Sequence, residues 1–115
     1  MEQKYLSELI SELSELYNKS LPLYELVTSR NYDRQRALLN INELYTNYSH
    51  ATLFTKMYPE LMRTEITQFF KTFETFYFQL KQVFLKEIEN TAALYHTLSI
   101  LKDNFEALST KLNLL

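Results

Sequence analysis

The sequence of 115 residues contains no glycine, no cysteine and no tryptophan, and only two prolines, Pro22 and Pro59. Tight turns depend chiefly on glycine and proline, so a chain almost without them is poorly suited to the many turns of a sheet protein. Helix-forming leucine, glutamate and lysine are frequent, and no stretch has the β-branched pattern of a strand. The composition therefore predicts an all-α protein.

The missing cysteines and the missing long apolar runs exclude further classes. Without cysteine there is no disulfide framework, no thiolate metal site and no cysteine nucleophile. No apolar run reaches the roughly 18 residues that a membrane span needs, and the polar residues from Met1 to Lys4 do not resemble the start of a signal peptide. We therefore expect a cytoplasmic protein with no membrane span.

Charge gives little indication of a nucleic-acid partner. The net charge is −2, so no general field attracts phosphate groups. Arg30, Arg34 and Arg36 surround Tyr32, and an aromatic ring beside arginines is one way to bind a single strand. A few arginines at the start of a helix are, however, more often a solvated face. We expect no nucleic-acid partner.

The first helix is predicted by apolar residues that recur every three or four positions from about residue 4 to residue 19. Pro22 ends this helix, kinks it, or lies in the first turn of a new helix capped by Ser20. We favour a kink near Pro22, with the apolar surface continuing to about Thr28.

A second helix is predicted after a loop, with Asp33 as its N-cap. Apolar residues with the helical period are Ala37, Leu38, Ile41, Leu44, Tyr45 and Tyr48. The pattern weakens beyond about Ser49. Pro59 then forces a boundary, because the residue before a proline is disfavoured in helical geometry.

Residues 60–115 contain neither proline nor glycine. One helix of this length would span about 84 Å, whereas a compact domain of this size has a radius of gyration of about 13 Å. A turn is therefore expected, and we place it near Gln82, with Asn90–Thr91 as the other candidate. The apolar side of the last helix is predicted to hold Ile88, Ala92, Tyr95, Leu98, Leu101, Phe105, Leu108 and Leu112. The expected architecture is a single domain, 1–115, folded as an antiparallel bundle of four helices.

The third helix carries the most unusual feature, a dense cluster of aromatic residues. One helical stripe of ordinary width is predicted to face the core and consists of Met62, Ile66, Phe69, Phe70, Phe73, Phe76, Tyr77 and Leu80. Phe78 and Leu85 lie one heptad apart and outside this stripe. Two readings stay open for this pair, namely burial against another helix of the same chain and contact with a partner or a second copy.

No residue pattern indicates catalysis, a metal or a cofactor. His50 and His96 are the only histidines and belong to no metal-ligand motif. The Glu-x-x-His pattern of di-iron bundles is absent, and so is the glycine of phosphate-binding loops. The isolated carboxylates are expected to be solvated charges, and they are Glu65, Glu74, Glu87 and Glu89. We expect no catalytic residue, no cofactor and no small-molecule substrate.

The C-terminal half resembles the last helix of the YppE-like family, small cytoplasmic bundles of Gram-positive bacteria. The similar segments are Phe84–Glu89, Leu94–Leu98 and Leu101–Asp103, and Tyr58–Phe70 is similar to the preceding helix. The resemblance covers about the last 50 to 60 residues. It implies a four-helix bundle of unassigned biochemical function and supplies no site residues.

The leading hypothesis is a non-enzymatic helical bundle of a Gram-positive bacterium or its mobile elements that acts through protein–protein contacts, made in part by Phe78 and Leu85. The alternative is a small accessory protein of a secretion, bacteriocin-immunity or phage system. An enzyme whose site is assembled from distant positions is the third class. Fold alone does not separate these hypotheses.

Overall fold

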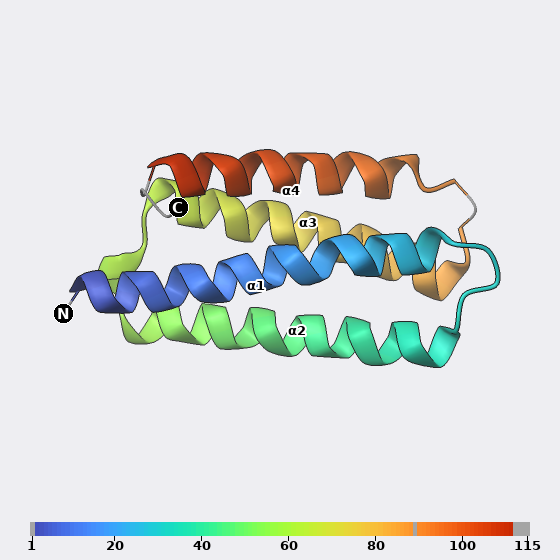
Figure 1. Ribbon diagram of the computed structural model, residues 1–115, viewed down its shortest axis with the longest axis horizontal. Helices are drawn as coiled ribbons and strands as arrows, with labels where there is room; N and C mark the ends of the chain where they lie inside the picture. The colour runs from blue at the N-terminus through green and yellow to red at the C-terminus, as the bar shows by residue number, and fades with distance from the viewer. Residues whose placement is uncertain (1, 89, 112–115) are drawn as a thin grey trace.

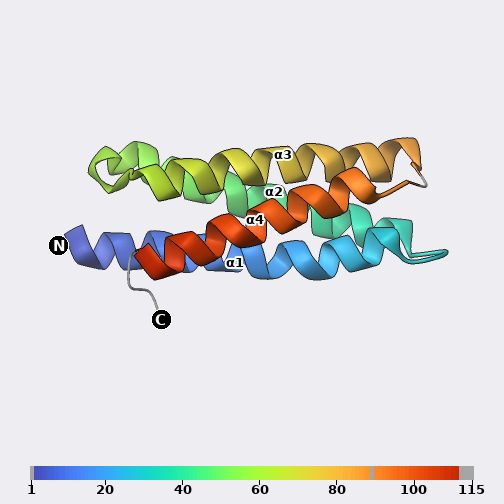
Figure 2. The same cartoon turned by 90° about the horizontal axis from the view of Figure 1, so that it is seen from above.

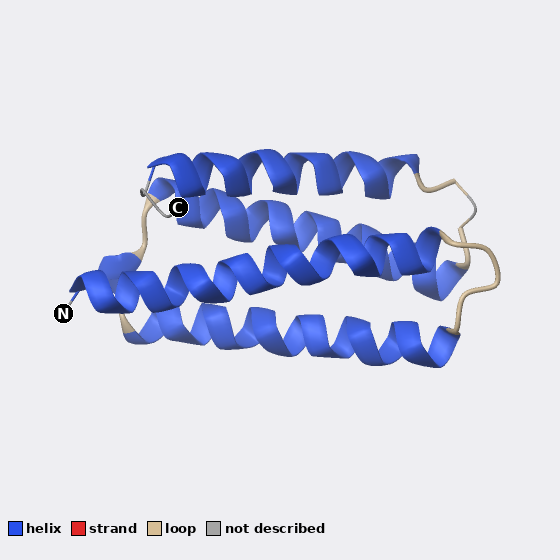
Figure 3. Ribbon diagram, viewed as in Figure 1, coloured by secondary structure: helices blue, strands red, loops and turns tan. Residues whose placement is uncertain are grey.

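The computed structural model describes residues 2–88 and 90–111 of the chain. They form four long α-helices and one short 3-10 helix, with no strand among the described residues (Figures 1 and 3). The elements in chain order are α1 (Glu2–Thr28), α2 (Arg34–Met57), η1 (Pro59–Leu61), α3 (Thr64–Lys86) and α4 (Ala92–Lys111). Successive helices run in opposite directions, so the predicted all-α, four-helix antiparallel bundle is confirmed.

Helix α1 continues through Pro22 and reaches Thr28, as predicted, and the kink near Pro22 stays a prediction. A proline inside a helix cannot donate to the carbonyl four residues earlier, which leaves the Asn18 carbonyl without its helical partner. Ser20 does not cap a new helix. Its buried hydroxyl donates to the carbonyl of Leu16 at 2.7 Å, so the backbone stays helical around it.

The turn between α1 and α2 has the predicted cap. Asp33 has extended backbone geometry, and its carboxylate accepts a hydrogen bond from the Arg36 amide at 3.1 Å. Asn31 adopts a left-handed conformation with φ of 53°, which asparagine tolerates better than most residues. These two residues supply the turn chemistry that glycine would otherwise provide.

Helix α2 extends to Met57, about two turns beyond the predicted weakening at Ser49. Ala51 and Thr55 explain the difference, because both are buried and continue the core face with small side chains. The helix ends where expected, immediately before Pro59. Pro59 begins η1, which carries the fully buried Leu61 into the end of the bundle.

The turn between α3 and α4 does not lie at Gln82, which is inside α3. Val83 and Phe84 are both buried, so one more helical turn adds apolar surface to the core. The helix ends at Lys86, and Glu87 follows it as a left-handed C-cap with φ of 51°. The other candidate, Asn90–Thr91, lies between α3 and α4, and the side chain of Asn90 accepts a hydrogen bond from the Ala92 amide at 3.0 Å.

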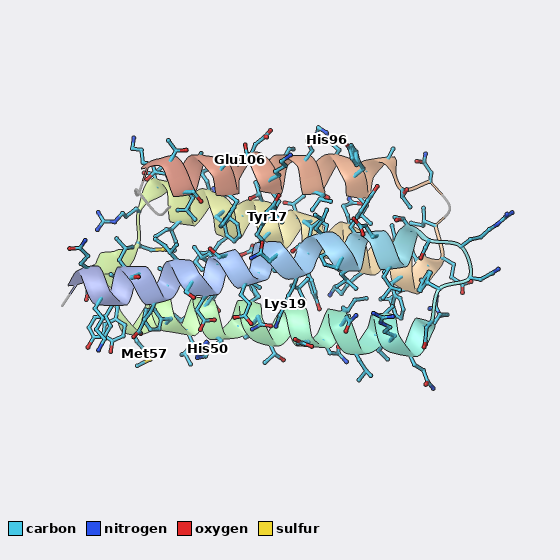
Figure 4. All side chains as sticks on the ribbon, viewed as in Figure 1. Tyr17, Lys19, His50, Met57, His96 and Glu106 are labelled. Carbon is cyan, nitrogen blue, oxygen red and sulfur yellow. The ribbon has the colours of Figure 1, made fainter. Side chains whose placement is uncertain are left out.

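The helices pack as two pairs, α1 with α2 and α3 with α4. Helix α4 crosses over α1 when the bundle is seen from above (Figure 2), and α1 also contacts α3. The bundle measures 47 × 23 × 20 Å. Lys19 of α1 links the first pair, since its ammonium lies 2.7 Å from the Glu43 carboxylate and 2.9 Å from the Asn47 side-chain oxygen (Figure 4).

The predicted core stripe of α3 is largely confirmed. Six of its residues are buried, namely Ile66, Phe69, Phe70, Phe73, Phe76 and Leu80. Met62 is exposed, which corrects the prediction. It precedes α3 and follows η1, so the helical period does not reach it. Tyr77 is half-buried at the edge of the stripe.

The apolar side predicted for α4 needs a larger correction. Leu98, Leu101 and Leu108 are buried as expected, and Phe105 is half-buried. Ile88, Ala92 and Tyr95 are exposed, and Leu112 lies outside the described residues. The buried seam is instead built on the heptad Leu94, Leu101 and Leu108, all fully buried. The prediction failed because it counted the helical repeat from Ile88. That residue precedes the first turn of α4, so the predicted side is rotated relative to the buried one.

Candidate functional site

The two histidines do not lie together. His50 lies on α2 and His96 on α4, and they point away from opposite edges of the bundle (Figure 4). His50 contacts the Glu12 carboxylate at 3.0 Å. Within residues 2–88 and 90–111, no three histidine, aspartate or glutamate side chains are grouped in a way that fits a metal ion. No helix in the described part is both long and apolar enough to cross a membrane.

The carboxylates named from the sequence contact other helices. Glu65 lies 4.0 Å from the Lys111 ammonium, Glu87 lies 3.3 Å from the Arg34 guanidinium, and Glu74 accepts a hydrogen bond from the Tyr48 hydroxyl. Glu89 lies outside the described residues. Each of the three described carboxylates thus joins separate parts of the bundle.

Arg34, one of the three clustered arginines, holds the end of α3. Its guanidinium donates to the Phe84 carbonyl at 3.0 Å and lies 4.4 Å from the centre of the Phe84 ring. The last carbonyls of a helix lack intrahelical partners, so this arginine satisfies one of them. A second nitrogen donates to the Tyr32 hydroxyl at 3.3 Å. The arginine and tyrosine that suggested a nucleic-acid platform therefore make intramolecular contacts.

Aromatic side chains connect α2 to α3. Tyr48 stacks on Phe73 with ring centres 5.1 Å apart, and Tyr45 lies 5.7 Å from Tyr77. Burial, and then the hydrogen bond that Tyr48 gives to Glu74, raises the pKa of the Tyr48 phenol well above its usual value of 10. These contacts fix which parts of the two helices lie side by side.

Phe78 and Leu85 remain at the surface, with 54% and 65% of their side chains exposed. No other helix of the described chain buries them, so the intramolecular reading of this pair is wrong. At 100° per residue, the pair lies on one arc of α3 with Lys71, Glu74 and Lys81. This arc adjoins the row of Phe70, Tyr77 and Phe84 that contacts α2, as the aromatic and arginine contacts show.

Helix α2 contributes a second exposed row, from two of the apolar residues that follow the helical period in the sequence. Leu38 and Tyr45 are one heptad apart and are 47% and 52% exposed. The buried heptad positions of α2 are one residue away, at Ala37 and Leu44. Spacing alone does not separate the two rows, because Leu38, Ile41 and Tyr45 follow helical spacings of three and four as regularly as Ala37, Ile41 and Leu44 do.

Together these rows define a surface that we call the α2/α3 face. Its residues come from two antiparallel helices and are Arg34, Leu38, Tyr45, Thr52, Lys56, Lys71, Glu74, Phe78, Lys81 and Leu85. Four of them are apolar or aromatic side chains with at least about half of their surface exposed, and four are cations. Several large apolar side chains exposed on one face are typical of a contact site.

A hollow of about 700 Å³ opens at one end of the α2/α3 face, between the last turns of α2, η1 and the first turns of α3. Its walls are largely methyl groups, rings and a thioether, contributed by Thr52, Thr55, Pro59, Met62, Thr67 and Phe70. Lys56, Lys71 and Glu74 stand among its lining residues. The hollow is wide enough for a large apolar side chain from another molecule.

A second hollow, of about 470 Å³, lies at the opposite end of the bundle beside the turn between α1 and α2. Arg34 and Glu87 form an ion pair across it, and Val27, Val83 and Ile88 supply its apolar part. Because its charged groups already pair with each other, this hollow offers less to a ligand than the first one.

The sequence was compared with protein-family models, with curated proteins and with solved structures, and none of them matches. The resemblance of the C-terminal half to the YppE-like family stays a prediction.

Proposed function

We propose that this protein is a non-enzymatic binding module that acts through protein–protein contacts made by the α2/α3 face. The observation that carries the proposal is the exposure of Phe78 and Leu85 beside Leu38 and Tyr45. Burying a large apolar side chain stabilises a complex by about 1.5 to 3 kcal/mol relative to leaving it in water. Four such groups on one face therefore provide the apolar centre of a contact surface.

The absence of catalysis and a cytoplasmic location belong to the same proposal. Several contacts between ionisable groups of the described residues join two parts of the bundle, as the contact of Glu74 with Tyr48 does, and they are not arranged around a common point where a substrate would react. A chain without cysteine is well suited to a reducing compartment.

The test removes the apolar pair without disturbing the core. The double variant Phe78→Ser with Leu85→Ser is immobilised beside the wild type, and each is used to capture proteins from a lysate of the source organism. A matched control, Leu39→Ser with Leu53→Ser, removes two exposed leucines of α2 that lie outside the α2/α3 face. Circular dichroism and light scattering are recorded on the same samples.

The proposal predicts a partner, or a self-association, that the Phe78 and Leu85 double variant loses and the control retains, with helicity unchanged in both. A monomeric wild type that captures nothing contradicts it. Unfolding of the double variant also contradicts it, because the pair would then stabilise the fold itself.

A further inference from the structure

We propose that the α2/α3 face binds an acidic, amphipathic helix of a partner protein. This inference rests on the proposed function and adds the chemistry of the partner. It is carried by three features of the same face, namely the sign of its charges, the spacing of its apolar residues and the hollow at its end.

The charge of the face is opposite to that of the whole protein. The chain has a net charge of −2, yet the face carries Lys56, Lys71 and Lys81 as exposed cations. Its single carboxylate, Glu74, accepts the hydrogen bond from Tyr48. Lys56 and Lys71 make no ion pair with any described residue, so both are available to a carboxylate from outside. Complementary charges at the rim of an interface speed association and select the partner.

The apolar residues of the face have the repeat that a docked helix needs. Leu38 and Tyr45 on α2, like Phe78 and Leu85 on α3, are separated by seven residues, about 10.5 Å along a helix. The Tyr45–Tyr77 contact places the two pairs beside each other. A third helix lying along both rows would meet apolar groups at each heptad, which is the helix-in-groove mode of recognition.

The hollow extends this surface beyond the two heptads. From Leu38 to Lys56 the face is about 27 Å long, enough for roughly five turns of a docked helix. Thr55, Met62 and Phe70 line the hollow near the far end of the face, between Lys56 and Lys71. One large apolar side chain of the partner would fill it, with flanking carboxylates facing the two lysines.

A second copy of this chain is a poorer fit. Two copies that presented the same face would bring lysines against lysines, which costs free energy at an interface. Helix α1 does carry exposed acidic residues, Glu8, Glu15 and Glu25, but the only exposed large apolar residue among its described side chains is Leu21. It therefore lacks the apolar heptads that the face requires.

A membrane surface or a nucleic acid fits less well than a helix. Glu74 lies in the middle of the face and would repel phosphate groups from either ligand. Leu38 and Leu85 give nothing to phosphate recognition, and the hollow suits an inserted side chain better than a flat bilayer surface. These alternatives become outcomes of the test.

The probe is a fluorescent synthetic peptide of three heptads, with leucine at the apolar positions and glutamate at the flanking positions. A matched peptide has lysine at the flanking positions. Fluorescence anisotropy measures binding of each peptide to the full chain, to Lys71→Glu with Lys81→Glu, and to a control of equal charge change, Lys4→Glu with Lys102→Glu. The two control lysines lie on α1 and α4, away from the face.

The glutamate peptide is expected to bind the wild type at least about tenfold more tightly than the lysine peptide. The Lys71 and Lys81 variant should weaken this binding by a similar factor, added salt should weaken it further, and the control should leave it unchanged. The Phe78→Ser with Leu85→Ser variant should bind neither peptide.

Three results overturn the inference and leave the proposed function standing. The first is equal binding of the two peptides to the wild type. The second is a loss of binding in the Lys4→Glu with Lys102→Glu control as large as in the Lys71→Glu with Lys81→Glu variant. The third is dimerisation of the wild type through the face with no peptide binding. Binding only to phosphatidylglycerol vesicles or to a single-stranded oligonucleotide overturns both proposals.

Discussion

The guanidinium of Arg34 lies 4.4 Å from the centre of the Phe84 ring, fifty residues further along the chain. This one side chain joins the first turn of α2 to the last turn of α3 through a cation–π contact and a hydrogen bond to the Phe84 carbonyl. The contact lies at one end of the α2/α3 face and helps to hold the two helices beside each other.

Arg34→Gln is expected to lower the free energy of unfolding by about 1 to 2 kcal/mol, because it removes a cation–π contact and leaves the end of α3 without its donor. The ion pair with Glu87 adds little, since both side chains are largely exposed. Urea denaturation measures the loss. Arg36→Gln, with the same chemistry two residues away, should cost less than about 0.5 kcal/mol. Equal costs in the two variants would show that the contact does not stabilise the fold.

The aromatic core of α3 gives the largest predicted effect. Phe73 is buried and stacks on Tyr48, so Phe73→Ala is expected to cost about 3 to 5 kcal/mol in chemical denaturation. Phe78→Ala, five residues away on the exposed face, should cost no more than about 1 kcal/mol. A loss below about 1 kcal/mol for Phe73→Ala would show that the side of α3 assigned to the core is the wrong one.

Pro22 interrupts the hydrogen bonding of a helix that is otherwise continuous. Pro22→Ala is expected to raise the free energy of unfolding by about 1 to 2 kcal/mol. A proline inside a helix costs about 3 kcal/mol. Part of this cost is offset because proline also lowers the conformational entropy of the unfolded chain. Hydrogen exchange should also slow at the new residue 22 amide. A destabilised variant would mean that the bundle depends on the irregularity at this position.

Tyr48 predicts a pH dependence in alkaline solution. Its pKa is raised in the folded protein, so the unfolded chain loses the phenolic proton first as the pH rises. The contribution of this proton to stability is complete below the unfolded pKa of about 10 and declines above it. Urea unfolding between about pH 9 and pH 11 should therefore show a smaller decline for Tyr48→Phe than for the wild type. Parallel declines in the two proteins would contradict the assignment to Tyr48.

The helical fold follows from features that are local in the sequence. The absence of glycine, the apolar period of α1 and α3, the cap at Asp33 and the stop at Pro59 each act within a few residues, and all appear in the structure. The turn after α3 was misplaced because Glu87 adopts a left-handed conformation without glycine or asparagine. Nothing in the local sequence marks that position, and the burial of Val83 and Phe84 decides it.

The candidate site was predictable only in part. Phe78 and Leu85 stand out because the width of a helical stripe is fixed, so two large apolar residues beyond its edge are visible in the sequence. The exposure of Leu38 and Tyr45 could not be recognised from the sequence. Each residue directly follows a core residue, and their row has the same helical spacing as the core row. Only the packing of α2 against α1 shows which of the two neighbouring rows is buried. The cations that border the face come from two helices, and their meeting is a property of the tertiary fold.

The most direct measurement of the central claim is site-specific photo-cross-linking in cells of the source organism. Phe78→p-benzoylphenylalanine places the reactive group in the middle of the α2/α3 face, and Tyr95→p-benzoylphenylalanine places it on α4 at an aromatic position of similar exposure. The account predicts that residue 78 cross-links to another polypeptide on illumination and that residue 95 does not. Cross-linking from residue 95 alone, or from neither position, would contradict it.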